Sequence, residues 1–168
     1  MRHSLKRMLL SGASVVAIGL CAAAANSAPV VTDNHYEETK IKSCGAAAAE
    51  CALPMTAVPA GKRLLVTRVS CSVSYSNGPP AFSYFQFGRK SVTNPAGVDQ
   101  GTGPFNYLSP VLLPGAADID LRLYAINAQP DLMFSAGQIP YFYQAINEGK
   151  FGIFTCTIIG TLTTPRAT

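Results

Sequence analysis

The feature that most constrains the fold of this chain is an alternation of apolar and polar residues over positions 62–75. A period of two is typical of a strand with one buried face. The expected inward residues are Leu65, Val69, Cys71, Val73 and Tyr75, and the expected outward residues are Arg68, Ser70, Ser72 and Ser74. A second alternating segment, 151–162, carries Phe154, Cys156, Ile158 and Leu162 on one face. Because both cysteines lie on apolar faces, we expect Cys71 and Cys156 to tie the two strands across the core, with the first strand at the centre of a sheet.

The first 27 residues have the pattern of a secretory signal peptide: a basic start, an apolar run over 8–25, and small residues around the expected cleavage after Ser27 or Ala25. An uncleaved membrane anchor and a lipoprotein signal at Cys21 are the alternatives. The apolar run is barely long enough for a span, which needs roughly 20 residues, and Leu20 is bulky where lipoprotein signals have a small residue. We therefore expect a secreted or periplasmic protein with no stable membrane insertion after cleavage.

The charge of the remaining chain argues against nucleic acid as a partner. The 13 Lys and Arg residues include three in the signal segment, which leaves ten against nine Asp and Glu. Only 62–63 and 89–90 are adjacent basic pairs. Nucleic-acid binding needs a basic stripe or patch, and this chain has none in its sequence.

Four cysteines remain after the signal segment, and an even number in a secreted chain indicates disulfides. We favour the pairing of Cys44 with Cys51, because they are close in sequence. We also favour the pairing of Cys71 with Cys156, because each lies on the apolar face of its strand. Closing the long loop between the second pair stabilises the fold by roughly 4 kcal/mol in the chain-entropy description. A zinc site is the alternative, but there is no Cys-x-x-Cys pair and one histidine remains, so we expect neither metal nor cofactor.

Beyond the signal segment, we predict a flexible N-terminal arm over 28–50 and one domain over 51–168. Strands are expected where alternating or aromatic runs are bounded by Gly, Pro or Asn, at 51–58, 62–75, 82–87, 105–113, 118–126, 132–135, 139–146 and 151–162. Short strands at this spacing predict an all-β protein. It is expected to be a single antiparallel β-sandwich of jelly-roll or immunoglobulin-like kind, with about eight strands, stapled by disulfides.

Three details of this arrangement follow from local sequence. The short turn 59–61 predicts that the first two strands form a hairpin. Pro140 is expected to place its strand at a sheet edge, because proline lacks a donor for the ladder. Along 118–126 the expected inward residues are Ile119, Leu121 and Leu123, and the expected outward residues are Asp118, Asp120, Arg122 and Tyr124.

Residues suited to catalysis are few, so we predict that the protein is not an enzyme. His35 is the one histidine after the signal segment and the cysteines are expected to be paired, which excludes His-based and Cys-based catalysis. Asp118 and Asp120 offer a carboxylate pair for glycosidase chemistry, but Arg122 on the same face favours a solvated row of charges. The same pair with Asp131 is the candidate for calcium, without a recognisable ligand loop around it.

Ligand binding is favoured by the tyrosines and by a long irregular segment over 88–104, since such loops are usually functional or disordered. Tyr84 and Tyr107 supply aromatic surface, and Asn94 and Asp99 supply hydrogen-bonding groups. Aromatic packing within the fold is the alternative role of the tyrosines. We expect a secreted non-catalytic binding or surface module whose ligand is a carbohydrate or a surface protein. A structural subunit of a cell-surface assembly and a carboxylate-based hydrolase are the alternatives.

Three stretches carry a resemblance to known proteins: 58–66, which reads VPAGKRLLV, then 69–71, and 156–162, which reads CTIIGTL. Together they resemble small secreted bacterial β-sandwich proteins of uncharacterised function. The resemblance covers the two alternating strands and little between them. It implies no catalytic residue.

Overall fold

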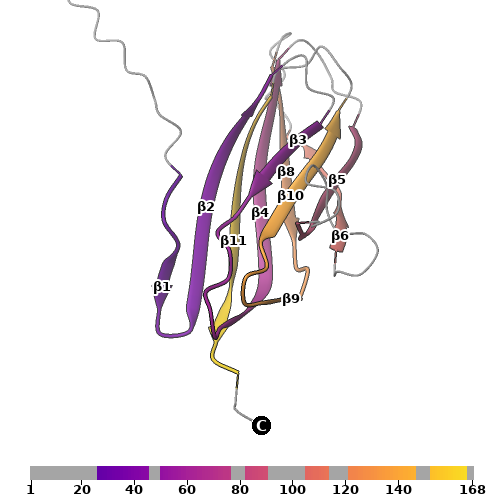
Figure 1. Cartoon of the computed structure of the whole chain (residues 1–168). Helices are drawn as coiled ribbons and strands as arrows, with labels where there is room; N and C mark the ends of the chain where they lie inside the picture. The colour runs from indigo at the N-terminus through magenta and orange to yellow at the C-terminus, as the bar shows by residue number, and fades with distance from the viewer. Residues whose placement is uncertain are drawn as a thin grey trace, which may run out of the picture.

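The computed structural model describes residues 26–45, 50–76, 82–90, 105–113, 121–146 and 152–165. Over these residues the protein contains eleven strands and no helix, and the strands form two antiparallel sheets (Figure 1). Sheet A has the order β1 (Val30–Thr32), β2 (His35–Cys44), β11 (Gly152–Thr163), β4 (Arg63–Ser76), β8 (Leu121–Ala128) and β7 (Val111–Leu112), with β9 (Leu132–Ser135) also paired to β4. Sheet B has the order β3 (Glu50–Pro54), β10 (Pro140–Ile146), β5 (Phe82–Arg89) and β6 (Phe105–Leu108).

The expected central strand is confirmed, because β4 lies between β11 and β8 in sheet A. Cys71 and Cys156 form the expected disulfide. The two residues face each other directly in the β4–β11 ladder, with their Cα atoms 4.1 Å apart. The expectation that this bond crosses the core is therefore wrong, since it joins neighbouring strands on the inner side of one sheet.

The second expected disulfide, between Cys44 and Cys51, is also present. Cys44 ends β2 in sheet A and Cys51 lies in β3 of sheet B, so this bond connects the two sheets. Both cysteines are buried. The pair that is close in sequence thus makes the inter-sheet link that was expected of the distant pair.

The alternation of β4 changes phase at Thr67. The β4–β11 register shifts next to Gly160, so that β4 carries one extra residue there, which is a β-bulge. After the bulge the inward residues are those expected. Before it, Leu64 and Val66 are fully buried and Leu65 is half-buried on the opposite side. The expectation that Leu65 faces the core is wrong, because the extra residue reverses the facing of the residues that precede it.

Alternate residues of both sheets pack between the sheets to form the core. The ring centroids of Phe85 in sheet B and Phe154 in sheet A are 6.1 Å apart, and those of Phe87 and Phe134 are 5.8 Å apart. The inward face expected for 151–162 is confirmed by the burial of Phe154, Cys156, Ile158 and Leu162. The core therefore draws on both sheets, including β9, which pairs with β4 alone.

Residues 30–44, expected in a flexible arm, form β1 and β2 instead. β2 pairs with β11 along its whole length. On its inward side, Tyr36, Glu38 and Cys44 are buried. The polar composition of this segment concealed the strand, because a buried acidic residue is tolerated only where hydrogen bonds and a cation satisfy it, and such partners lie far away in sequence.

Two expectations about neighbouring strands are also wrong. The segments 51–58 and 62–75 do not make a hairpin, since β3 belongs to sheet B and β4 to sheet A. Pro140 does not mark an edge, because β10 lies between β3 and β5. It is the first residue of β10, where the strand starts, and its carbonyl oxygen accepts a hydrogen bond from the backbone N–H of Met55 at 2.9 Å.

The strand expected over 118–126 is present as β8, but its facing is reversed. Ile126 lies opposite Cys71 and is buried, and Tyr124 lies opposite Val73 on the same inner side. Arg122 shares this side, whereas Leu123 is on the outer one. Apolar residues occur on both faces of this strand, so the local pattern does not decide which face is buried. The pairing with β4 decides it.

The number of strands exceeds the expected eight for two reasons. The segment 105–113 divides at Ser109 and Pro110 into β6 in sheet B and β7 in sheet A. The N-terminal region adds β1 and β2. The observed architecture is therefore all-β with two antiparallel sheets and two disulfides.

Candidate functional site

The outer side of sheet B carries a group of aromatic residues from β5, β6 and β10. We name it the tyrosine face, and it consists of Tyr84, Phe105, Tyr107, Tyr141 and Tyr143. These residues occupy alternate positions whose intervening neighbours, such as Phe85 and Phe142, point into the core. The strong aromatic content of these strands therefore serves both sides of one sheet.

Tyr84 is the centre of the tyrosine face. Its ring is stacked on that of Tyr143 in β10, with centroids 5.7 Å apart and planes inclined by 28°. On the other side it meets Tyr107 of β6 edge-on at 6.4 Å. The register explains both contacts, because Tyr84 lies diagonally across from each ring, a separation that aromatic side chains can bridge.

Exposure changes steeply across the tyrosine face. Tyr143 is only 5% exposed, whereas Tyr107 is 64% exposed on the edge strand β6. Burial raises the pKa of the Tyr143 hydroxyl well above its usual value, and its hydrogen bonds with Glu50 and Tyr84 raise this pKa further. The face therefore offers one open ring backed by rings held in fixed positions, with the exposed carboxylate-bearing residue Glu50 at its β3 side.

The residues expected to bind a ligand are partly brought together. Tyr84 and Tyr107 are in contact, as just described. Asn94 and Asp99 lie outside the described residues, as do Asp118 and Asp120. Tyr124 belongs to sheet A and meets Tyr75 edge-on at 6.4 Å, so it is not part of the tyrosine face.

Sequence reasoning missed Phe105 and Glu50 as members of this region. Phe105 lies edge-on to Tyr107, with ring centroids 5.6 Å apart. Phe105 and Tyr107 are two residues apart on one strand, so their side chains lie on the same side of the sheet. This spacing is the sequence signal that could have revealed Phe105. Glu50 could not be found in this way, because its place beside Tyr143 depends on the pairing of β3 with β10.

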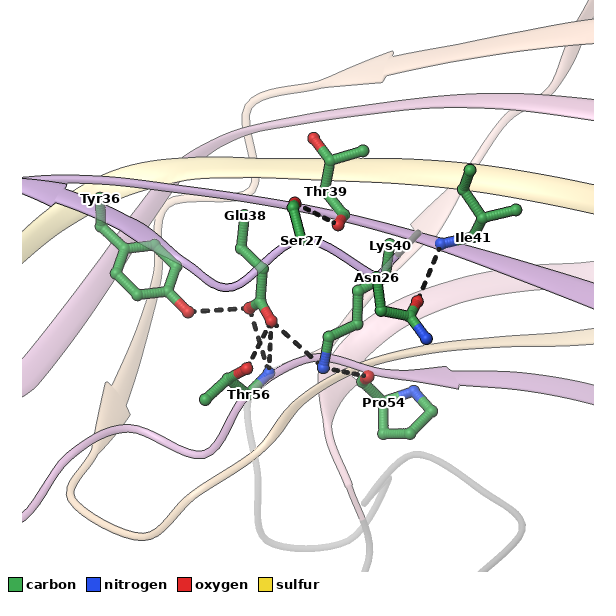
Figure 2. Close-up of polar contacts among 9 residues, drawn as sticks. All are labelled: Asn26, Ser27, Tyr36, Glu38, Thr39, Lys40, Ile41, Pro54 and Thr56. Carbon is green, nitrogen blue, oxygen red and sulfur yellow. Dashed lines mark hydrogen bonds and ion pairs between the residues drawn. The ribbon is translucent and has the colours of Figure 1, made fainter. Parts of the chain in front are cut away.

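A second polar site, the Glu38 cluster, lies between β2 and the segment that follows β3, and consists of Tyr36, Glu38, Lys40 and Thr56 (Figure 2). The Glu38 carboxylate is buried and accepts hydrogen bonds from the Tyr36 hydroxyl at 2.8 Å and from the Thr56 backbone N–H at 3.0 Å. The Thr56 hydroxyl also donates to it. The Lys40 ammonium lies 3.2 Å from it and donates to the Pro54 carbonyl oxygen.

The chemistry of the Glu38 cluster is structural. The carboxylate accepts hydrogen bonds from β2 and from the segment after β3, and the Lys40 ammonium beside it also donates to a backbone carbonyl. Burial raises the pKa of the Tyr36 hydroxyl, and its hydrogen bond to Glu38 raises this pKa further, so this proton stays in place. Within the described residues, the hydrogen-bonding capacity of this carboxylate is therefore largely used by its neighbours in the fold.

Within the described part of the chain, no group of His, Cys, Asp and Glu side chains is arranged to hold a metal ion. No helix of those same residues is long and apolar enough to cross a membrane. No protein-family model matches the chain, and no curated protein matches it. The class of the protein therefore rests on its fold and its site. It is a disulfide-bonded, all-β protein of two antiparallel sheets with aromatic residues on the outer side of one sheet.

Proposed function

We propose that this protein is a non-catalytic binding module, secreted or periplasmic, that recognises carbohydrate with the tyrosine face of sheet B. The observation that carries the proposal is the Tyr107 ring, which is 64% exposed beside the stacked pair Tyr84 and Tyr143. An open ring held in place by packed neighbours can stack on the apolar face of a sugar with little loss of side-chain entropy. The carboxylate of Glu50 can accept hydrogen bonds from sugar hydroxyl groups.

The architecture and the covalent links support the proposed location and fold type. Two disulfides are compatible with an oxidising compartment outside the cytoplasm. Two antiparallel sheets packed on a common core support a sandwich of jelly-roll or immunoglobulin-like kind, in which the exposed Tyr107 ring on the edge strand β6 is open to a ligand. The proposed ligand class is a neutral or weakly charged glycan presented at a surface.

The test is a glycan array probed with labelled protein, followed by titration of any glycan that binds. Tyr107→Ala is expected to weaken binding about 2- to 12-fold, because an aromatic stacking contact contributes about 0.5 to 1.5 kcal/mol. Tyr107→Phe keeps the ring and is expected to retain binding. Val111→Ala is the matched control, since Val111 is also 64% exposed but lies in sheet A. Undiminished binding by Tyr107→Ala would contradict the site assignment.

A structural subunit of a surface assembly is the second candidate, favoured by exposed apolar residues on the edge strands of sheet A. Val30 and Val31 of β1 are 59% and 48% exposed, and Val111 and Leu112 of β7 are 64% and 45% exposed. Apolar residues on free strand edges favour pairing between molecules. A monomer that persists at all concentrations in light scattering would count against this candidate.

A further inference from the structure

The ladder along β4 has a gap where two strands succeed each other. β9 pairs with residues 63–66 of β4 and β8 pairs with residues 69–76, so the pairing skips Thr67 and Arg68. The chain passes from β8 to β9 through residues 129–131. An open pocket of about 610 Å³, the Arg68 pocket, lies at this gap and is lined by Arg68, Asn127, Ala128 and Gln129.

The β-bulge at Thr67 is what turns Arg68 toward this pocket. Leu64 and Val66 face the core, so an unbroken alternation would point Arg68 inward as well. The extra residue at the bulge reverses the phase, and Arg68 is exposed on the outer side of sheet A. Bulges commonly re-aim a side chain beside a functional site.

The polar side chains that line the Arg68 pocket supply several hydrogen-bond donors. The Ser70 hydroxyl donates to Asn127 Oδ1 at 3.0 Å, which uses one lone pair of the amide oxygen and leaves the amide nitrogen as a donor. The Arg68 guanidinium and the Gln129 amide add further donors. None of the lining residues that the structure describes is acidic. Asp131, which follows Gln129 by two residues, is not among them.

We propose that the Arg68 pocket binds a small organic carboxylate of the size of an acidic monosaccharide. A guanidinium presents paired donors that match the two oxygens of a carboxylate. The Asn127 and Gln129 amides suit the hydroxyl groups of such a ligand, and the volume falls within the roughly 300 to 1,000 Å³ of small-molecule sites. This proposal does not rest on the tyrosine face, which belongs to the other sheet.

The experiment is an NMR titration of the full-length secreted protein with glucuronate, and with methyl glucoside as the uncharged control. Glucuronate is expected to shift the amide signals of Arg68, Asn127 and Gln129, and methyl glucoside is expected to leave them unchanged. Arg68→Ala is expected to weaken glucuronate binding about 10- to 100-fold, the effect of losing a charged hydrogen-bonding group. Arg68→Lys keeps the charge without the paired donors and is expected to fall between the two.

Two controls separate a carboxylate site at Arg68 from a general effect of positive charge. Arg63→Ala, which removes an exposed arginine at the start of the same strand, is expected to leave binding unchanged, and an equal loss would show a general charge effect and overturn the proposal. Inorganic phosphate is the competing anion, and a response to phosphate without a response to glucuronate would overturn the assignment to a carboxylate. Undiminished binding by a folded Arg68→Ala variant would do the same.

Discussion

The buried carboxylate of Glu38 provides a direct test of how the two sheets are held together at the β2 edge. The side chain has no exposed surface, and its partners come from β2 and from Thr56 in the segment that follows β3. In Glu38→Ala, the Tyr36 hydroxyl loses its acceptor and the Thr56 backbone N–H loses its carboxylate partner. Each buried group left without a partner costs about 1 to 3 kcal/mol.

The expected loss in the free energy of unfolding for Glu38→Ala is about 2 to 6 kcal/mol, because two buried groups each lose a partner. We place little of this on Lys40, because its side chain is 18% exposed and keeps the Pro54 carbonyl oxygen as an acceptor. Glu38→Gln retains one acceptor oxygen and is expected to lose less. Against a typical total of about 5 to 15 kcal/mol, the alanine variant loses a large share of its stability.

The assay is equilibrium unfolding in urea followed by circular dichroism, with the slope of the transition compared between variants. Glu37→Ala is the matched control, since the neighbouring carboxylate is 47% exposed and lies 3.7 Å from the His35 imidazole. Its expected change is within about 0.5 kcal/mol, as for exposed ion pairs. A loss below about 1 kcal/mol for Glu38→Ala would refute the argument that the cluster couples the two sheets.

Two further predictions concern the bulge and the buried tyrosines. Gly160→Ala is expected to cost about 1 to 3 kcal/mol or more in urea unfolding, because a Cβ atom there would overlap the backbone carbonyl of Leu65. Gly45→Ala, where nothing lies within 4 Å of the added atom, is the control, and equal behaviour of the two variants would disprove the close approach. Burial raises the pKa of Tyr36, Tyr75 and Tyr143 above the unfolded value of about 10. Their contribution to stability is thus complete below about pH 10 and declines above it, by up to about 1.4 kcal/mol per pH unit for each tyrosine. Tyrosinate absorbance and circular dichroism should then change together in an alkaline titration, and ionisation of all tyrosines near pH 10 without loss of structure would contradict the assigned burial.

Part of the candidate site follows from the sequence, because alternation is a local property. Tyr84 and Tyr107 lie on strands that the aromatic pattern predicted, and the structure brings them into contact. Tyr143, which stacks on Tyr84, lies in the strand expected over 139–146, but the local pattern did not indicate which ring it would meet. Which rings meet depends on the register of β5 with β6 and β10, and register is set by pairing between segments far apart in the chain.

By itself, the sequence determined the all-β class and the central place of the strand that carries Cys71, and it favoured the two disulfide pairs that the structure contains. These follow from period-two patterning, from the short sequence separation of Cys44 and Cys51, and from the apolar faces on which Cys71 and Cys156 lie. The tertiary structure alone decided that β2 completes sheet A, that the distant disulfide lies within one sheet, and that a bulge directs Arg68 outward. Each of these depends on which strands become neighbours. The packing of the whole core selects those neighbours, and the residues of a single strand cannot.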